Sequence, residues 1–339
     1  MEEHAVRGLP GPNSFDTIFV GGGTPTLLEH QQLERLLTWL RGLLTTSGEL
    51  TIECNPETVT RQLAALLATT ATRVSVGAQS TNPSSLAVLE RRATPEQIHA
   101  AVTMLRDAGV RQLNLDVIWG IPGQTESDLQ RDLARLLDLQ PDHVSAYELD
   151  FKPGTRLTRT WGSREAAVGE VSDHMYELVA ETIVDAGFQW YETANFARQG
   201  SQCRHNTSVW RGEDYAGIGI GAVGTITASR RRNRPSLPRY LEAAIQRGDA
   251  PHDTELLSDA TRSAEHIMLG LRLQEGVHVS ATDAAVAIDH DALEWLTSMH
   301  MIEGERHTDG SQHLQLTKQG RFLANDVVGR LLRWPEVEH

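Results

Sequence analysis

Cysteine is almost missing from this sequence. Cys54 and Cys203 are the only two cysteines in 339 residues. Two thiols are too few for a disulfide-stapled scaffold, and also for an iron–sulfur cluster that three or four thiolates of one chain would hold. This shortage limits the redox chemistry that the polypeptide can support by itself.

Long apolar segments and positive charge are also scarce. No apolar run approaches the roughly 18 residues that a membrane-spanning helix needs, and the start, Met1-Glu-Glu-His, lacks the basic and apolar stretches of a secretory signal. We therefore expect a cytoplasmic protein without an integral membrane segment. The formal net charge of −14 disfavours binding to nucleic acid or to an anionic membrane.

One dense basic run stands against this acidic background, at Arg230-Arg231-Arg232 with Arg234. Because Pro235 and Pro238 follow it, the run has the character of a solvated loop. The alternative is a site for an anion such as a porphyrin propionate, since arginine pairs with carboxylates bidentately.

Short β-rich runs alternate with helical leucine patterns from Thr17 to Tyr147, which is typical of βαβ units and a parallel sheet. The predicted strands are Thr17–Val20, Leu50–Glu53, Arg73–Gly77, Gln112–Ile118 and His143–Leu149. The leucines between these strands recur at helical spacing and predict packed helices. The first of these helical patterns, between the first two strands, extends through Leu43 and Leu44. In such folds the carboxyl ends of the strands form the edge where ligands bind.

The pattern changes after Asp150. A helix near Val171–Ala186 precedes a strand near Gln189–Thr193, and residues 229–258 resemble a linker with a short helix near Tyr240–Gln246. From Thr261 onward, helical patterns and a β-hairpin that turns at Asp309-Gly310 predict a small α+β, winged-helix-like domain. That region has 12 acidic residues against 7 lysines and arginines, which favours a packing or lid role over nucleic-acid binding.

Polar residues gather at the predicted strand ends. The run Gly21-Gly22-Gly23-Thr24-Pro25 follows the first strand and allows backbone amides to approach a small ligand. It matches neither a dinucleotide fingerprint nor a P-loop. Glu53, Gln79 and Asp116 end later strands, and Arg91 lies in the helical region after Gln79. Four such groups at one edge suit the ammonium, carboxylate and ribose hydroxyls of a zwitterionic nucleoside.

The order of motifs resembles the HemW and HemN branch of the radical S-adenosylmethionine proteins, which comprises heme chaperones and oxygen-independent coproporphyrinogen III oxidases. The motifs are FVGGGTPTLL, IECNPE, VSVGAQS, LERR, NLDVIWGIPGQT, HVSAYEL, YETANFAR, HNTSVW and YAGIGIGA, with EHIMLGLRLQEG nearer the C-terminus. The likeness spans nearly the whole chain.

This resemblance implies an α/β fold with a partial, TIM-like (β/α) barrel in residues 1–228, a linker in 229–258 and a HemN-type C-terminal domain in 259–339. It also implies an S-adenosylmethionine site along the strand ends. Gly22, Gly23 and Thr24 would line its methionyl end, and Glu53, Gln79, Arg91 and Asp116 would hold its polar groups.

The sequence departs from the family at one important position. Family members carry a C-x-x-x-C-x-x-C loop before the glycine motif, whose thiolates hold a [4Fe–4S] cluster, and only 20 residues precede Gly21 here. Cys54 and Cys203 cannot replace that loop. We therefore expect a late start codon or a fragment, with the first barrel strand missing and Met1–Gly11 corresponding to the end of the helix before the second strand.

A second motif concerns heme. The family's heme-binding H-N-x-x-Y-W motif resembles His205-Asn206-Thr207-Ser208-Val209-Trp210, with Val209 in place of the tyrosine. The resemblance implies that His205 offers a nitrogen to heme iron, and that Asn206 and Trp210 contact the macrocycle. Cys203 is an alternative soft ligand.

Three functions follow as hypotheses. The first is a heme-binding chaperone that delivers heme to a hemoprotein such as a respiratory enzyme. The second is an oxygen-independent coproporphyrinogen III oxidase-like enzyme of porphyrin biosynthesis, which would need the cluster. The third is a degenerate paralogue that binds neither ligand. The sequence leaves enzymatic activity and oligomeric state open, a dimer included.

Overall fold

The computed structural model describes residues 14–163, 171–246 and 250–334, and the expectation for Met1–Gly11 lies outside them. The chain forms two compact units. We call Phe15–Arg204 the sheet unit and the described residues from His205 onward the C-terminal unit. Within the described residues, no helix is both long and apolar enough to cross a membrane.

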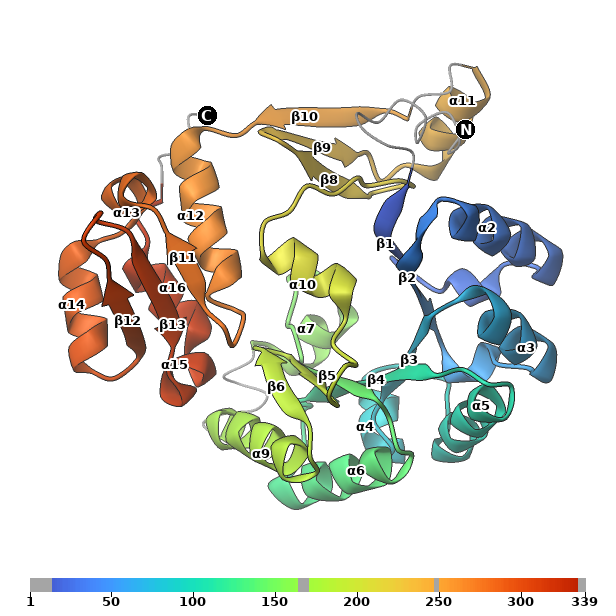
Figure 1. The fold of residues 1–339 in the computed structure, drawn as a ribbon. Helices are drawn as coiled ribbons and strands as arrows, with labels where there is room; N and C mark the ends of the chain where they lie inside the picture. Colours follow the sequence, from blue (N-terminus) through green and yellow to red (C-terminus); the bar gives the residue numbers. More distant parts are fainter. Residues whose placement is uncertain (1–13, 164–170, 247–249, 335–339) are drawn as a thin grey trace. The chain divides into compact units, whose positions relative to one another are not determined.

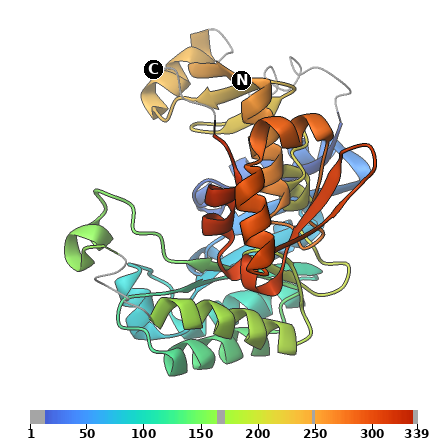
Figure 2. The same cartoon turned by 90° about the vertical axis from the view of Figure 1, so that its left-hand side faces the viewer.

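The sheet unit is built on seven strands in the order β1-β2-β3-β4-β5-β7-β6. The first five are parallel, whereas β7 pairs antiparallel with both β5 and β6. The sheet curls into a partial barrel with helices on its outer face (Figures 1 and 2). The strands are β1 (Phe15–Val20), β2 (Leu44–Cys54), β3 (Arg73–Gln79), β4 (Gln112–Trp119), β5 (His143–Glu148), β6 (Gln189–Glu192) and β7 (Asn195–Ala197).

Several helices of this unit begin at a side-chain cap. Thr94 and Thr125 form capping boxes, which satisfy amide groups that a helix start leaves unpaired. The helices are η1 (Pro25–Leu27), α2 (His30–Gly42), η2 (Pro56–Thr58), α3 (Arg61–Thr70), α4 (Pro83–Val88), α5 (Pro95–Asp107), α6 (Glu126–Asp138), α7 (Arg156–Trp161) and α9 (Val171–Asp185).

The five predicted parallel strands are confirmed, with one difference at the start of β2. Leu44, which the leucine spacing placed in a helix, opens β2 and pairs with Phe15. The helix ends at Gly42, because the apolar spacing that suggested its continuation belongs to the edge of the sheet.

Alternation along the central strands gives the sheet two different faces. The side chains of one face are apolar and at most 2% exposed: Leu50, Ile52, Val74, Val76, Leu113, Leu115, Val144 and Ala146. The intervening side chains are polar: Thr51, Glu53, Arg73, Ser75, Asn114, Asp116, His143 and Ser145. Because successive residues of a strand point to opposite faces, the outer face packs as an apolar core under the helices and the inner face is polar.

The C-terminal unit holds two small antiparallel sheets, β10-β9-β8 and β11-β13-β12. The second packs on a hydrophobic core with α12, α13, α14 and α16. The elements are α10 (Arg204–Trp210, its first residue in the sheet unit), β8 (Val223–Ile226), β9 (Ser229–Asn233), α11 (Leu237–Gln246), β10 (His252–Leu256), α12 (Asp259–Gly270), β11 (Val277–Val279), α13 (Ala281–Ala287), α14 (His290–Ser298), β12 (Ile302–Arg306), β13 (Gln312–Leu316), α15 (Lys318–Phe322) and α16 (Ala324–Leu331). The predicted hairpin is β12–β13.

The short helix predicted near Tyr240–Gln246 is present as α11, but residues 229–258 are not otherwise a linker, because β9 and β10 pair there as strands. The basic run is therefore a strand rather than a solvated loop. Arg230 forms two hydrogen bonds with the Glu265 carboxylate, of 2.6 and 2.9 Å, and Arg234 pairs with Asp253 at 2.6 Å. Strands that pair through charges lack apolar alternation, so the pattern gave no strand signal there.

Candidate functional site

The glycine motif after β1 lies directly against Glu53 of β2. A side chain at Gly21 would place its Cβ 2.7 Å from the carboxyl carbon of Glu53, so only glycine fits without displacing it. Gly22 has φ +82° and donates its backbone N–H to the Glu53 carboxylate. Thr24 accepts a 2.9 Å hydrogen bond from the Asn55 amide. The turn after β1 and the end of β2 therefore form one edge.

Two carboxylates from neighbouring parts of the sheet influence each other. Burial raises the pKa of Glu53, and the Gly22 N–H partly offsets this effect. The pKa of Asp116 is raised to about 7, chiefly by burial and also by the negative charge of Glu53. The hydrogen bond from Asn114 and the positive charge of Arg91 act in the opposite direction. The structure thus brings together three groups that the sequence predicted at this edge: Glu53, Asp116 and Arg91.

Gln79 ends β3 in a backbone conformation that needs support. Its φ is +64°, a left-handed value that is uncommon for residues other than glycine. Its amide nitrogen would lie 2.9 Å from a Cβ at Gly77, so Gly77 makes room for it. The next two residues are held by Asp132 of α6, which accepts hydrogen bonds from the Ser80 hydroxyl and from the N–H and hydroxyl of Thr81. Asp132 is 2% exposed, and its carboxylate fixes the chain just after Gln79.

A continuous chain of hydrogen bonds links Asp116 to the backbone of Cys203. Asn114 donates its amide to Asp116 at 2.7 Å and accepts at 2.6 Å from Nδ1 of His143. Tyr191 then donates to Nε2 of His143 at 2.8 Å and accepts the backbone N–H of Cys203 at 3.2 Å. The orientation of the Asn114 amide assigns the imidazole proton to Nδ1. Burial, followed by the charge of Arg73, holds the pKa of His143 well below its usual value, so the ring is neutral.

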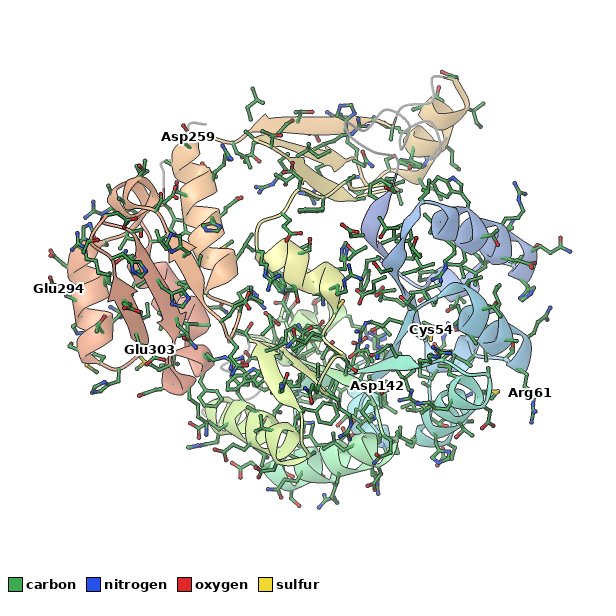
Figure 3. All side chains as sticks on the ribbon, viewed as in Figure 1. Cys54, Arg61, Asp142, Asp259, Glu294 and Glu303 are labelled. Carbon is green, nitrogen blue, oxygen red and sulfur yellow. The ribbon has the colours of Figure 1, made fainter. Side chains whose placement is uncertain are left out.

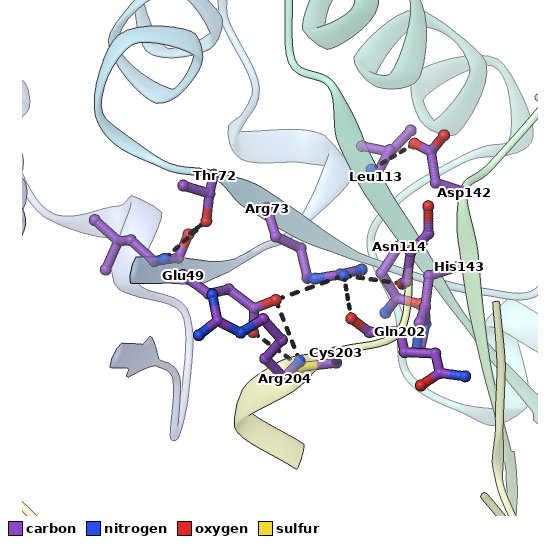
Figure 4. Close-up of polar contacts among 12 residues, drawn as sticks. Glu49, Thr72, Arg73, Leu113, Asn114, Asp142, His143, Gln202, Cys203 and Arg204 are labelled. Carbon is purple, nitrogen blue, oxygen red and sulfur yellow. Dashed lines mark hydrogen bonds and ion pairs between the residues drawn. The ribbon is translucent and has the colours of Figure 1, made fainter. Parts of the chain in front are cut away.

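Cys203 belongs to a second polar cluster of the sheet unit (Figure 4). Arg73 donates to the backbone carbonyls of Ser201 and Gln202 at 2.9 and 3.0 Å and lies 3.7 Å from the Glu49 carboxylate. The Cys203 thiol points to Glu49 at 3.5 Å and is 2% exposed. The structure therefore places this sulfur inside the unit.

Neither cysteine suits an iron–sulfur cluster. Cys54 is buried at the end of β2 beneath the helices, whereas Arg61 of α3 lies on their outer side (Figure 3). Burial, followed by the charges of Asp116 and Glu57, raises the pKa of the Cys54 thiol, which keeps it protonated. No group of three metal-ligating side chains occurs among the residues that the structure describes. The residues described here thus do not fit the cluster.

The heme motif forms the short helix α10. His205 and Val209 are four residues apart and share one side of the helix, as do Asn206 and Trp210. At 100° per residue, His205 and Trp210 lie about 140° apart around the axis. The structure therefore does not direct the predicted iron ligand and the predicted aromatic surface to the same side.

Sequence reasoning missed several residues that support the site, namely Asn114, Asp132 and Tyr191, and it assigned His143 only a structural role. One signal was present: alternate residues along β3, β4 and β5 are polar in strands whose other residues are apolar. Asp132 could not be found this way, because it lies in a helix, 51 residues after the Thr81 whose N–H it accepts.

Comparisons with known proteins agree with this architecture. The model of the Radical SAM superfamily matches residues 4–136. The heme chaperone HemW of Mycobacterium tuberculosis (strain CDC 1551 / Oshkosh) is 36% identical over 335 residues, covering 97% of this chain and 84% of that protein. The heme chaperone HemW of Escherichia coli (strain K12) is 35% identical over 319 residues, or 92% of this chain and 82% of that protein.

A solved structure shows the same fold. The coproporphyrinogen III oxidase HemN of Escherichia coli, described as a radical SAM enzyme, superimposes with a TM-score of 0.80 at 21% identity, covering 97% of this chain and 81% of that one. Identity this low supports the fold alone, whereas the HemW relatives match at higher identity over most of both sequences. The chain belongs to the heme chaperone HemW family, within the radical S-adenosylmethionine proteins.

Proposed function

We propose that this protein is a heme chaperone, which binds heme and passes it to a recipient hemoprotein. The observation that carries the proposal is the 36% identity to a heme chaperone over 97% of the chain. The sequence His205 to Trp210 supports it, because it supplies an imidazole, an amide and an indole on one helix. The recipient would be a hemoprotein such as a respiratory enzyme.

Within this proposal His205 is the iron ligand and Cys203 is not. A thiolate ligand must be deprotonated and accessible, but the Cys203 thiol is buried against the Glu49 carboxylate. His205 is half-buried, and a neutral imidazole is a common heme ligand. Asn206 and Trp210 lie on the other side of α10, so a macrocycle held by His205 would not contact them in this arrangement.

Heme titration followed by absorbance tests the proposal. The wild-type protein should give a saturable Soret band. His205→Ala should shift or abolish that band, while Cys203→Ala should leave it unchanged, because the sulfur does not reach solvent. A wild-type protein that develops no Soret band would refute the proposal, and a band altered only in Cys203→Ala would assign the ligand to the thiolate instead.

We also propose that the strand-end edge of the sheet unit binds S-adenosylmethionine. The carboxylates of Glu53 and Asp116 suit its ammonium and ribose hydroxyls, the Arg91 guanidinium suits its carboxylate, and Gln79 offers an amide. Gly22, Gly23 and Thr24 would line the methionyl end. The residues described here would position the nucleoside, and Asp116, whose pKa is raised, would hold a proton beside it.

Isothermal titration with S-adenosylmethionine and with S-adenosylhomocysteine tests this second proposal without any cluster. Glu53→Gln should weaken both ligands about tenfold, because each has the ammonium group and a charge-assisted hydrogen bond contributes about 1.5–3 kcal/mol. Glu57→Gln, on the exposed turn after β2, is the matched control. Equal affinities of wild type and Glu53→Gln would contradict the assignment.

A further inference from the structure

The chain of hydrogen bonds between Cys203 and Asp116 has a fixed direction. It begins at the backbone N–H of Cys203, which can only donate and reaches the Tyr191 oxygen at 3.2 Å. The Tyr191 hydroxyl gives its own proton to Nε2 of His143, 2.8 Å away. Because Nε2 accepts, the neutral imidazole carries its proton on Nδ1 and donates it to the Asn114 oxygen at 2.6 Å. Every donor of the chain thus points toward Asp116.

This direction decides which atoms of Asn114 face Asp116. The amide oxygen is taken by His143, so the NH₂ group donates to Oδ1 of Asp116 and to the Ser75 hydroxyl, each at 2.7 Å. The Ser75 hydroxyl itself lies 3.4 Å from the same Oδ1. Both neighbours therefore converge on one carboxylate oxygen, and a proton taken up by Asp116 binds to the other one, Oδ2.

The chain is closed to water, whereas the carboxylate at its end is not. The side chains of Asn114, His143, Tyr191 and Cys203 belong to residues that are at most 4% exposed, while Asp116 is half-buried. A ligand can therefore reach Asp116, but the four residues can act on that ligand only through Asp116.

We propose that this chain is a positioning device of the nucleoside site: it keeps a donor on Oδ1 of Asp116 and so directs the proton of that carboxyl to Oδ2. Its positioning residues are Tyr191, His143 and Asn114. The inference rests on the proposed S-adenosylmethionine site and adds the residues that control the protonation of its carboxylate.

Tyr191 is the residue whose loss reveals the mechanism. Without its hydroxyl, Nε2 of His143 loses its donor, and the imidazole can carry its proton on Nε2 instead of Nδ1. The Asn114 amide can then turn its oxygen toward Asp116. A protonated Asp116 donates to that oxygen, which stabilises the neutral carboxyl, so the proton should be held to higher pH.

The ionisable neighbours of Asp116 in the described structure are Glu53, Arg91, Cys54 and Tyr147. The first two are charged and act on the pKa of Asp116 in opposite directions. The thiol and the phenol stay neutral, because burial raises the pKa of both. Substitutions in the chain leave these four side chains in place, so a change in the titration of Asp116 reports on the chain.

The titration of Asp116 tests the inference before any ligand is added. Carboxyl-carbon NMR of aspartate-labelled protein follows it from about pH 5 to about pH 9, and the spectrum of Asp116→Asn identifies the resonance. Tyr191→Phe should move the midpoint upward by about one pH unit, the effect of one hydrogen bond to a charged group. Asn114→Leu removes the donor itself and should move it at least as far. Tyr176→Phe is the control and should not move it, because its hydroxyl donates to the Thr193 carbonyl, outside the chain.

A double variant and a ligand separate positioning from damage to the fold. Tyr191→Phe combined with Asn114→Leu should titrate like Asn114→Leu alone, because Tyr191 acts through the Asn114 amide. Affinity for S-adenosylhomocysteine should follow the same midpoints. Tyr191→Phe should bind it about fivefold more weakly than wild type at about pH 7, and equally well at about pH 9, where Asp116 is ionised in both. A structural defect would weaken binding at both values.

Two results would overturn the inference. One is a folded Tyr191→Phe protein, by circular dichroism, in which Asp116 titrates as it does in wild type. The other is a double variant in which the two shifts add, because Tyr191 would then not act through Asn114. If the midpoints move as expected but wild type does not bind S-adenosylhomocysteine, control of the Asp116 proton by the chain is upheld and the proposed nucleoside site is wrong.

Discussion

The two units offer polar groups in opposite ways. On the inner face of the sheet unit, Asp116, Asn114 and His143 have partners at 2.6 to 2.8 Å, and the chain of bonds runs on to Tyr191. In the C-terminal unit, the Trp210 N–H is buried and has no acceptor among the described residues. The comparison sets a hydrogen-bonded chain behind Asp116 against a buried donor that has no acceptor among the described residues.

The largest expected effect tests how firmly the sheet unit is fixed. Asp132→Ala removes the acceptor for three donors on Ser80 and Thr81, which stay buried. Buried unsatisfied donors cost about 1–3 kcal/mol each, so unfolding in urea should show a loss of about 3 kcal/mol or more. Affinity for S-adenosylhomocysteine should fall as well, since the conformation of Gln79 loses its support.

Asp138→Ala is the matched control, because this residue lies on the same helix and its side chain is exposed. It should change stability by less than about 0.5 kcal/mol. If Asp132→Ala were as stable as Asp138→Ala, the hydrogen bonds of Asp132 would not be what holds the chain after Gln79.

The next substitution, Asp116→Asn, should increase stability at neutral and higher pH. The pKa of Asp116 is raised to about 7 in the folded state, while an unfolded aspartate titrates near 3.9. Between about pH 4 and 7 the folded protein therefore holds a proton that the unfolded chain has released, and stability falls as pH rises through this window. Asp116→Asn removes the titration and can keep the hydrogen bond from Asn114.

Stability measured by urea unfolding should thus be similar in wild type and Asp116→Asn at pH 4. At pH 8 the variant should be more stable by about 4 kcal/mol, which is the linkage expected for a pKa moved from about 3.9 to about 7, and should bind S-adenosylmethionine more weakly. A difference between the two proteins that does not grow from pH 4 to pH 8 would show that the carboxyl titrates normally.

The fold was more predictable than the site because it depends on local patterns. Short β-rich runs and helical leucine spacing located β1 to β5 and the helices between them. At the site, the sequence placed Glu53 and Asp116 at strand ends, which the parallel topology brings together. It could not pair Asp132 with Thr81 or Cys203 with Tyr191, since these contacts join segments that only tertiary packing brings close. It also missed β9 and β10, whose charged pairing leaves no apolar period.

Removing one polar group from each unit, with Tyr191→Phe in the sheet unit and Trp210→Phe in the C-terminal unit, tests the comparison. Tyr191→Phe removes a hydroxyl that donates to His143 and accepts from Cys203, so two buried groups lose a partner. The expected loss is about 2 kcal/mol by urea unfolding. Thr60→Val at the start of α3, which deletes one capping acceptor, should cost only about 1 kcal/mol. A Tyr191→Phe variant as stable as wild type would show that the chain of bonds contributes nothing.

Trp210→Phe makes the corresponding deletion in the C-terminal unit and should have the smallest effect on stability. It removes some packing and part of the stacking surface for Arg272, but it also removes a buried N–H that has no acceptor among the described residues. Because an unsatisfied buried donor itself costs about 1–3 kcal/mol, the two changes should largely cancel, to within about 1 kcal/mol. Protoporphyrin affinity should nevertheless fall several-fold, since the variant has no N–H to donate to the ligand. A variant that loses more stability than Tyr191→Phe, with unchanged porphyrin affinity, would assign Trp210 to the core of the unit rather than to ligand binding.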